Sequence, residues 1–417
     1  MSLTPLQLEA DLTGFLDGEP RVMQDPYALY ATLREGAPVL EHGAYTFVSR
    51  FEDVRAVYLD HERFKKSYFA EGTLAESVRA RVPAELRAIY DEVDRFEGMF
   101  LPRTDDELHA RLRSIAHRAF TPRMIAGLES YIRECTDQLL DAASDHAEVD
   151  LTEAFTYRLP LLAIARMLGV PAEDAPLIHS WSAVMGAFEG RTNMDALVPW
   201  HNALTEFRAY VNDLVKSFRS APPDANLTTA LLDARGGDSL SEEELLAMFV
   251  VLLFAGHETT TNLIGNGLIA LMHQRDQWTL LCEQPELAET AVEELLRYDA
   301  PIQYTARLPV VDADIGGAPI RSGHTLLLLI GSANRDPVAF DEPDRIDITR
   351  PGNRHLSLLL GIHFCLGASL ARLEGKIAFT ELSRRFPELE LAADEFEWNS
   401  NPMLRGVKQL PVRLGTA

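Results

Sequence analysis

Residues 361–367 read Gly361-Ile362-His363-Phe364-Cys365-Leu366-Gly367, and they run directly into Leu366–Phe386, a long segment with a helical pattern. This order places a cysteine at the start of a helix, where backbone N–H groups and the helix dipole favour a thiolate. The two glycines let a flat ligand approach the backbone closely. The same pattern also suits a buried structural cysteine between glycine caps, so the segment alone leaves two interpretations open.

Composition narrows the class of protein around this cysteine. The chain has 417 residues, a formal net charge of −24 and 47% hydrophobic residues, which indicates a globular protein with a large core. Its only cysteines, Cys135, Cys282 and Cys365, are far apart, which excludes a disulfide framework and predicts a cytoplasmic protein. The excess of acidic residues argues against nucleic acid and anionic membranes as main partners.

A second segment carries polar residues inside an apolar helix. Ser241 and Glu244 form an expected capping box, and the helix that they open continues to about Arg275. Its apolar run, Leu245–Gly256, is too short to span a bilayer and ends in Ala255-Gly256-His257-Glu258-Thr259-Thr260. Burying such polar side chains is costly unless they have partners or a function. The alternative is a helix face that emerges into solvent.

The rest of the chain predicts a mainly α protein with a minor β region. Helical patterns dominate up to residue 300, and residues 334–364 are irregular, as functional loops often are. No linker separates two compositions, so we expect one domain over residues 1–417. Short strands are expected after Pro301, at Arg307–Asp312, Asp314–Ile315, Ala318–Arg321 and Thr325–Ile330.

Two pairs of charged residues are informative only by their place in the chain. Glu294 and Arg297 share one helix face, which by itself predicts no more than a solvated ion pair. His109 and Arg113 also lie one turn apart on a helix. Each pair gains meaning from its position relative to the central helix and to Cys365.

In this order and spacing the segments resemble the cytochrome P450 family, and the resemblance covers nearly the whole chain. The family's haem-binding loop commonly reads Phe-Gly-x-Gly-x-His-x-Cys-x-Gly, and this chain matches it from Gly361 onward. It departs upstream, where Leu358 replaces the Phe and Leu359 replaces the first Gly. Because burial and hydrogen bonds around the sulfur set the potential of a haem thiolate, we expect a slightly altered redox potential.

The resemblance implies a cytochrome P450 fold, with haem b (heme b, iron protoporphyrin IX) between the long central helix and the cysteine loop. Cys365 would be the axial iron ligand, Glu258 would relay protons, and Thr259 would position the group that donates them. His257 would be a neighbouring polar residue, and Thr260 and Thr261 would be structural. Further implied roles are cofactor contacts at His109, Arg113, Ala255, Gly256, Arg307, His363 and Gly367, and an ion network of Glu294, Arg297 and Arg345.

The activity implied is that of a haem-thiolate monooxygenase that inserts one oxygen atom from O2 into a small, largely apolar substrate. At this length we expect no fused reductase, so electrons would come from ferredoxin or flavodoxin, reduced by an NAD(P)H-dependent reductase. We expect a monomer with a basic docking face for an acidic carrier. The residues expected in that face are Arg111, Arg118, Arg354 and Arg372, and those in the substrate pocket are Phe100, Val251, Phe254, Ile302 and Met403.

Three other functions remain open at this point. A peroxide-driven haem peroxygenase would not need the proton relay at Glu258 and Thr259. A non-catalytic haem sensor would use Cys365 only as a ligand, and a haem-free helical protein would carry the cysteine motif by chance. No feature selects the substrate, or says whether it is free or bound to a carrier.

Overall fold

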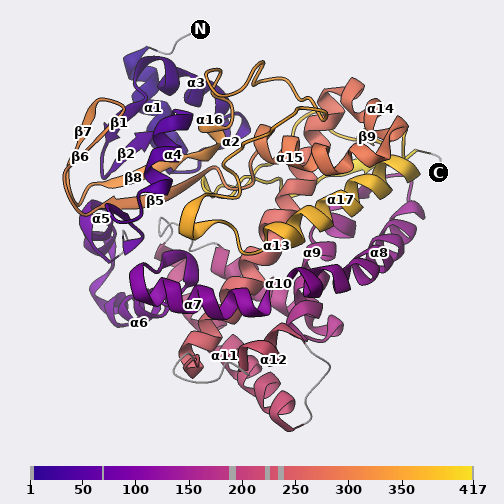
Figure 1. Cartoon of the computed structure of the whole chain (residues 1–417), viewed down its shortest axis with the longest axis horizontal. Coiled ribbons are helices and arrows are strands. Elements are labelled where there is room, and N and C mark those ends of the chain that lie inside the picture. Colours follow the sequence, from indigo (N-terminus) through magenta and orange to yellow (C-terminus); the bar gives the residue numbers. More distant parts are fainter. Residues whose placement is uncertain (1–3, 68–69, 187–193, 221–225, 233–238, 416–417) are drawn as a thin grey trace.

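The computed structural model describes residues 4–67, 70–186, 194–220, 226–232 and 239–415, and helices dominate it. In Figure 1 the long helices gather on one side, and most of the strands lie with the N-terminal helices on the other. The helices are α1 (Pro5–Leu16), α2 (Pro20–Gln24), α3 (Tyr27–Gly36), α4 (Phe51–Leu59), α5 (Gly72–Arg81), α6 (Arg87–Glu97), α7 (Asp106–Ala119), α8 (Pro122–Ser144), α9 (Arg158–Leu168), α10 (Ala175–Gly186), α11 (Leu197–Ser220), α12 (Leu227–Leu232), α13 (Glu242–His273), α14 (Arg275–Glu283), α15 (Ala288–Tyr298), α16 (Ile330–Ala333) and α17 (Ala368–Arg385).

The strands are short and form three small sheets. They are β1 (Val39–His42), β2 (Tyr45–Val48), β3 (Phe64–Lys65), β4 (Val149–Asp150), β5 (Tyr304–Pro309), β6 (Ala313–Ile315), β7 (Ala318–Ile320), β8 (Thr325–Leu329), β9 (Glu390–Leu391) and β10 (Pro411–Arg413). The largest sheet has the order β1-β2-β8-β5-β3, and only its β2–β8 pair is parallel. This sheet joins the beginning of the chain to its last third.

Helix α13 crosses the main core. Ser241 and Glu244 form the expected capping box at its start, since each side chain accepts a hydrogen bond from the other's backbone N–H. By length and composition α13 is apolar enough to span a membrane, but most of it is buried inside the protein. It packs against α9, α15 and α17. It is therefore a core helix, and its few exposed residues mark where the interior opens.

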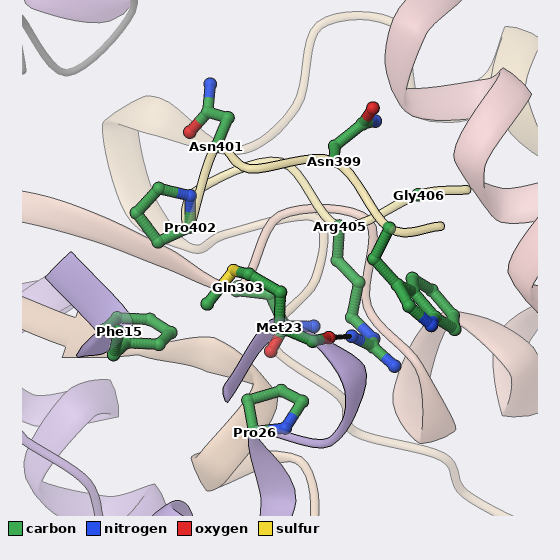
Figure 2. A pocket seen from close by; sticks show the side chains of 10 residues that line it. Phe15, Met23, Pro26, Gln303, Asn399, Asn401, Pro402, Arg405 and Gly406 are labelled. Carbon is green, nitrogen blue, oxygen red and sulfur yellow. Dashed lines mark hydrogen bonds between the residues drawn. The ribbon is translucent and has the colours of Figure 1, made fainter. Parts of the chain in front are cut away.

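The two ends of the chain are joined by polar contacts around Arg405. Its guanidinium donates to the carbonyl of Met23 at 2.6 Å and to Asp299 at 2.8 Å, and it stacks on Trp398 at 3.6 Å. Figure 2 shows Met23 and Arg405 beside a pocket of about 10 Å³, enough for one water molecule at most. The contacts of Arg405 therefore stabilise this junction, and the pocket beside it is too small to be a substrate site.

The secondary structure agrees with most of the sequence expectations, with two corrections. The expected strand Arg307–Asp312 is shifted, because β5 begins at Tyr304 and ends at Pro309, where it pairs with β8 and β3. Helix α5, Gly72–Arg81, was not expected from the sequence. The mainly α fold class with a minor β region is confirmed.

Candidate active site

Cys365 lies between a 3₁₀ turn at Gly361–His363 and the start of α17. Its N–H donates to the carbonyl of Leu358 at 2.8 Å, and the N–H of Gly367 bonds to its sulfur. Burial raises the pKa of the Cys365 thiol, and it outweighs the opposing effects of Gly367, Arg113 and Arg372. The backbone N–H of Gly367 at the helix start acts to lower this pKa, as the sequence predicts, but burial of the sulfur outweighs it. A bound metal cation would favour the thiolate.

The loop that leads to Cys365 is held by a buried carboxylate on α15. Glu294 and Arg297 are fully buried, and the guanidinium donates to both carboxylate oxygens at 2.7 and 2.8 Å. Arg297 also donates to the carbonyls of Asn334, Pro343 and Arg345. One carboxylate, one guanidinium and three carbonyls thus converge where the bare pattern predicted only a solvated pair. These contacts indicate a structural role.

The third charged member of this network is Arg350, which corrects the expectation of Arg345. The Nε atom of Arg350 lies 3.1 and 3.2 Å from the two oxygens of Glu294. The side chain of Arg345 instead faces Glu342, in an exposed pair at 3.4 Å. Arg345 contributes only its backbone carbonyl to the network, because the turn around it points its side chain to solvent.

Basic side chains gather beside the cysteine loop. His109 of α7 lies 3.0 Å from the carbonyl of Ile362, and its ring contacts the ring of His363 at 4.3 Å. Arg113, one turn further on α7, donates to the carbonyl of Phe364. Arg307 of β5 is buried over the ring of Tyr58. The structure therefore brings together four of the seven expected cofactor contacts, His109, Arg113, Arg307 and His363, from three separate segments.

These neighbours oppose a positive charge on His363. Burial lowers its pKa well below the usual range, and the charges of Lys66, Arg307, His109 and Arg113 lower it further. Lys66 was missed in the sequence, because a lysine after a two-residue strand carries no signal of its own. Such a buried basic cluster needs negative charge, and the two propionates of a haem fit that need.

On α13, Ala255 is exposed although the helix is buried on both sides of it. Glu258 and Thr259 follow on the same face and are half-buried. The Thr259 hydroxyl donates to the carbonyl of Ala255 at 3.0 Å, the backward hydrogen bond typical of threonine in helices. An exposed alanine in the middle of a core helix indicates a space beside it, and a flat cofactor fits such a space.

Gly256 has a different role from the one expected. A Cβ atom at this position would lie 2.9 Å from Cγ1 of Ile164 in α9. The glycine therefore lets α9 and α13 pack closely, and the expectation that its missing side chain clears room for the cofactor was wrong. Gly367 is the N-cap residue of α17, and no side chain lies within 4 Å of the place a Cβ would take there.

The expected pocket residues lie on four separate segments. Val251 and Phe254 are on α13, and the Phe254 ring packs against Gly186 of α10. Phe100 precedes a 3₁₀ turn and meets Phe96 edge to face at 5.5 Å. Ile302 and Met403 are brought together by an isolated bridge, Ile302 with Leu404, and by a hydrogen bond from Gln303 to Met403.

The cysteine loop and the basic cluster beside it fit an iron protoporphyrin held between α13 and that loop. Cys365 would ligate the iron, and His109, Arg113, Arg307 and His363 would meet the propionates. When bound, this group activates dioxygen. The chain's own residues would position it, through Cys365 and the basic cluster around His363.

The comparisons with known proteins point to one family. The family described as Cytochrome P450 matches residues 196–284 and 281–412. The chain is 39% identical to the Vitamin D(3) 25-hydroxylase of Pseudonocardia autotrophica, over 94% of each chain. It is 36% identical to the polyketide biosynthesis cytochrome P450 PksS of Bacillus subtilis, over 94% of this chain and 96% of that one.

Solved structures agree as well. The structure of PksS superposes with a TM-score of 0.84 at 35% identity, covering 95% of this chain and 99% of that one. P450BioI, solved in complex with an acyl carrier protein ligated to hexadec-9Z-enoic acid, superposes with a TM-score of 0.85 at 34% identity, covering 95% and 99%.

The chain belongs to the cytochrome P450 family. It is a haem-thiolate monooxygenase that uses haem b, acts on small molecules, and receives electrons from NAD(P)H through redox partners.

Proposed function

We propose that Cys365 is the iron ligand and that the basic cluster around His363 binds the propionates. The observation that carries this proposal is the convergence of the buried Cys365 thiol and that cluster from distant parts of the chain. The spectrum of the reduced, CO-treated protein tests it. Cys365→Ala should abolish the red-shifted Soret band, whereas Cys135→Ala and Cys282→Ala should retain it.

Glu258 and Thr259 supply protons during oxygen activation in this proposal. They share the half-buried face of α13 next to Ala255. Glu258→Gln and Thr259→Val should each lower the product formed per NADPH consumed, by about 10²-fold if proton transfer becomes limiting. Thr261→Val, on the buried side of the same helix, is the control. Equal losses in the control would remove the special role of the pair.

Glu258 and Thr259 also favour O2 over hydrogen peroxide as the oxygen donor in this proposal. A peroxygenase or a haem sensor has no need of an acid and an alcohol placed side by side on the distal helix. We therefore expect activity with O2 and a reductant to exceed activity with hydrogen peroxide. Stronger product formation with peroxide alone would favour the peroxygenase, and no product with either oxidant would favour the sensor.

The substrate that we propose is a small, largely apolar molecule. Val251, Phe254, Phe100, Ile302 and Met403 supply apolar surface, and relatives are named for vitamin D3, a polyketide and a carrier-bound fatty acid. The three molecules in these names share an extended carbon skeleton. A screen for compounds that shift the iron spin state tests this proposal. Each carboxylic acid in the screen is tested both free and as its acyl-carrier-protein thioester, so that free and carrier-bound substrates are compared.

We propose ferredoxin or flavodoxin as the electron donor, docking at a groove of about 550 Å³ between α7 and the cysteine loop. Arg113, Ser114, His117 and Phe364 line it, and Phe364 is 40% exposed. Two residues of the expected basic face are less suited. Arg111 pairs with Glu244, and Arg372 donates to Glu293 at 2.6 and 2.8 Å.

The docking groove can be tested by adding negative charge. Ser114→Glu should slow reduction by an acidic carrier about tenfold at low salt, and less at high salt. Ser144→Glu, at the exposed end of α8, is the control. Equal reduction rates for the two variants would place the donor elsewhere.

We also propose that residues 1–417 act as one domain, as a monomer in the cytoplasm. The domain is supported by the pairing of β2 with β8, which ties both ends of the chain into one sheet. Sedimentation at micromolar concentration tests the monomer, and a dimer mass would contradict it.

A further inference from the structure

His257 and Glu258 together hold a proton. His257 is 1% exposed, and its Nδ1 atom lies 2.6 Å from the carbonyl oxygen of Leu253. A carbonyl only accepts, so Nδ1 carries a hydrogen and Nε2 is the atom that faces Glu258, at 3.5 Å from Oε1. A bare Nε2 lone pair against a carboxylate would be repulsive, so one proton must lie on Nε2 or on the carboxyl.

A second histidine extends this pair toward the surface. His179 lies on α10, half-buried, with exposed Ser180 next to it in sequence. Its ring centroid lies 6.4 Å from that of His257, and its other face stacks on Tyr157 at 4.3 Å. Within the part of the chain that the structure describes, neither His179 Nδ1 nor His257 Nε2 has a hydrogen-bond partner, although both atoms are buried.

We propose that His179 and His257 form a relay that delivers protons from solvent to Glu258. This inference rests on the role proposed for Glu258. His179 does not touch the reacting atoms: it acts through His257, and His257 acts through Glu258. A buried imidazole nitrogen without a short hydrogen bond is costly to maintain, and a relay that must exchange protons explains why His179 Nδ1 has none and why His257 Nε2 faces only the Glu258 carboxylate, at 3.5 Å.

The transfer needs no change in oxidation state. When Glu258 gives the shared proton to the active site, neither its carboxylate nor Nε2 of His257 carries one. Nε2 then takes a proton from the His179 imidazolium and shares it with the Glu258 carboxylate, and solvent restores the proton on His179. Rings with centroids 6.4 Å apart are too far for a direct hydrogen bond, so one bridging water carries the middle step.

The charges around the relay suit this direction of transfer. Burial acts to raise the pKa of Glu258, but His257 and His179 outweigh it and hold that pKa below its usual value. Burial and then His257 lower the pKa of His179, whereas Glu258 and Glu153 oppose them. His179 is thus a weak base that releases a proton readily, with a carboxylate on either side of it.

The experiment compares His179→Gln with a matched control, His201→Gln. His201 is also half-buried and lies 3.2 Å from a carboxylate, Glu92, but on α11. In the haem-loaded proteins, infrared spectra over a range of pH follow the carboxyl band of Glu258, which is assigned by its loss in Glu258→Gln. NADPH-driven oxygen consumption in H2O and D2O, with a surrogate ferredoxin and reductase and no added substrate, gives the solvent isotope effect.

We expect the Glu258 pKa to rise in His179→Gln and to rise further in His257→Gln, because each removes a basic neighbour. The solvent isotope effect should grow about twofold or more in His179→Gln, and His179→Glu should restore it because it keeps a titratable group. His201→Gln should match the wild type in both measurements.

An unchanged Glu258 titration and isotope effect in His179→Gln would overturn the relay while leaving the role of Glu258 intact. An unchanged isotope effect in Glu258→Gln itself would overturn both. Nitrogen NMR of the wild-type protein, reduced and CO-bound, is independent of any variant's folding. It should show a histidine with Nδ1 protonated throughout, and absence of that tautomer at His257 would contradict the relay.

Discussion

Leu359 holds a backbone conformation that glycine adopts with less strain. Its φ is +58°, in the left-handed region, and its N–H donates to the carbonyl of Leu356. A residue with a Cβ pays about 1–2 kcal/mol there. The half-buried Leu359 side chain packs beside Leu356 and offsets part of that strain. The replacement of the family's usual glycine therefore preserves the loop's path to Cys365.

The strain at Leu359 predicts a reversed order of two small substitutions. At most positions alanine is more stabilising than glycine, by roughly 0.5–1 kcal/mol. At Leu359 both substitutions lose the same packing, but only glycine relieves the strain. The free energy of unfolding should therefore be higher for Leu359→Gly than for Leu359→Ala, by about 1 kcal/mol, and its urea midpoint should lie at a higher concentration. The usual order of the two would mean that the loop relaxes when the leucine is removed.

The expected change in redox potential also depends on Leu358 and Leu359. The loop keeps the hydrogen bond from Cys365 to Leu358, and Leu358 itself is buried. We expect the Leu358→Phe, Leu359→Gly double variant to shift the iron potential, because it changes burial beside the sulfur. An optical redox titration measures it, and potentials that coincide with the wild type would contradict the expectation.

Glu374 is a fully buried carboxyl on α17 that faces Thr260 of α13. Burial raises its pKa well above the usual range, and Thr260 opposes the shift only in part. The folded protein therefore keeps this proton at pH values where the unfolded chain, with a carboxyl pKa of about 4.3, has lost it. The free energy of unfolding must fall as pH rises above that value.

Glu374→Gln should remove this pH dependence, because an amide does not ionise. Between pH 5 and 8 the variant should gain stability relative to the wild type by roughly 1.4 kcal/mol per pH unit, until the folded pKa is passed. Urea titrations of the haem-loaded protein at several pH values measure it. The exposed Glu129→Gln should give a curve parallel to the wild type, and a parallel curve for Glu374→Gln would refute the assignment.

At the scale of single residues, the sequence predicted those whose role is set by the local pattern. Cys365 and His109 stand where the motif order places them. Arg350 could not be distinguished from Arg345, because the choice depends on which way a turn faces. The partnership of His179 with His257 was equally hidden, since it depends on the packing of α10 against α13.

Among the elements, α15 contributes most to the position of the cysteine loop. Arg297→Met removes the donor that joins Glu294 to three loop carbonyls, and leaves a buried carboxylate with fewer partners. We expect a loss of about 3–5 kcal/mol in the free energy of unfolding. Arg133→Met breaks an exposed pair with Glu129 on α8 and should change it by less than about 1 kcal/mol. Similar losses would show that the α15 pair is no stronger than a surface pair.

Elements with a strong local signal were also the ones predicted best. Helix α13 has its expected capping box and ends at His273, close to the expected Arg275. The strands β1, β4, β9 and β10 were not expected, because two to four residues carry too little periodicity. Their pairing partners are distant in the chain, and this tertiary information is absent from a local pattern.

For the whole molecule, the basic cluster around His363 predicts which segments are destabilised when haem is lost. Without haem, the basic cluster around His363 loses the propionates that we propose it binds. We expect the haem-free protein to lose roughly 4 kcal/mol or more of stability. Hydrogen exchange should increase first in α7 and in residues 355–367, while the sheet of β2, β8 and β5 stays protected. Increased exchange that begins in this sheet would contradict the expectation.

The parallel pair of β2 and β8 has a consequence for synthesis of the protein. Tyr45 pairs with Thr325, so the ribosome adds 280 residues before the partner of β2 exists. At about 5–20 residues per second, that interval lasts roughly 14–56 s. During it, the apolar strand and the helices around it are exposed to chaperones as an incomplete sheet. A nascent chain stalled before β8 leaves the ribosome tunnel should therefore be cleaved by protease within residues 39–65, and one stalled well beyond it should resist.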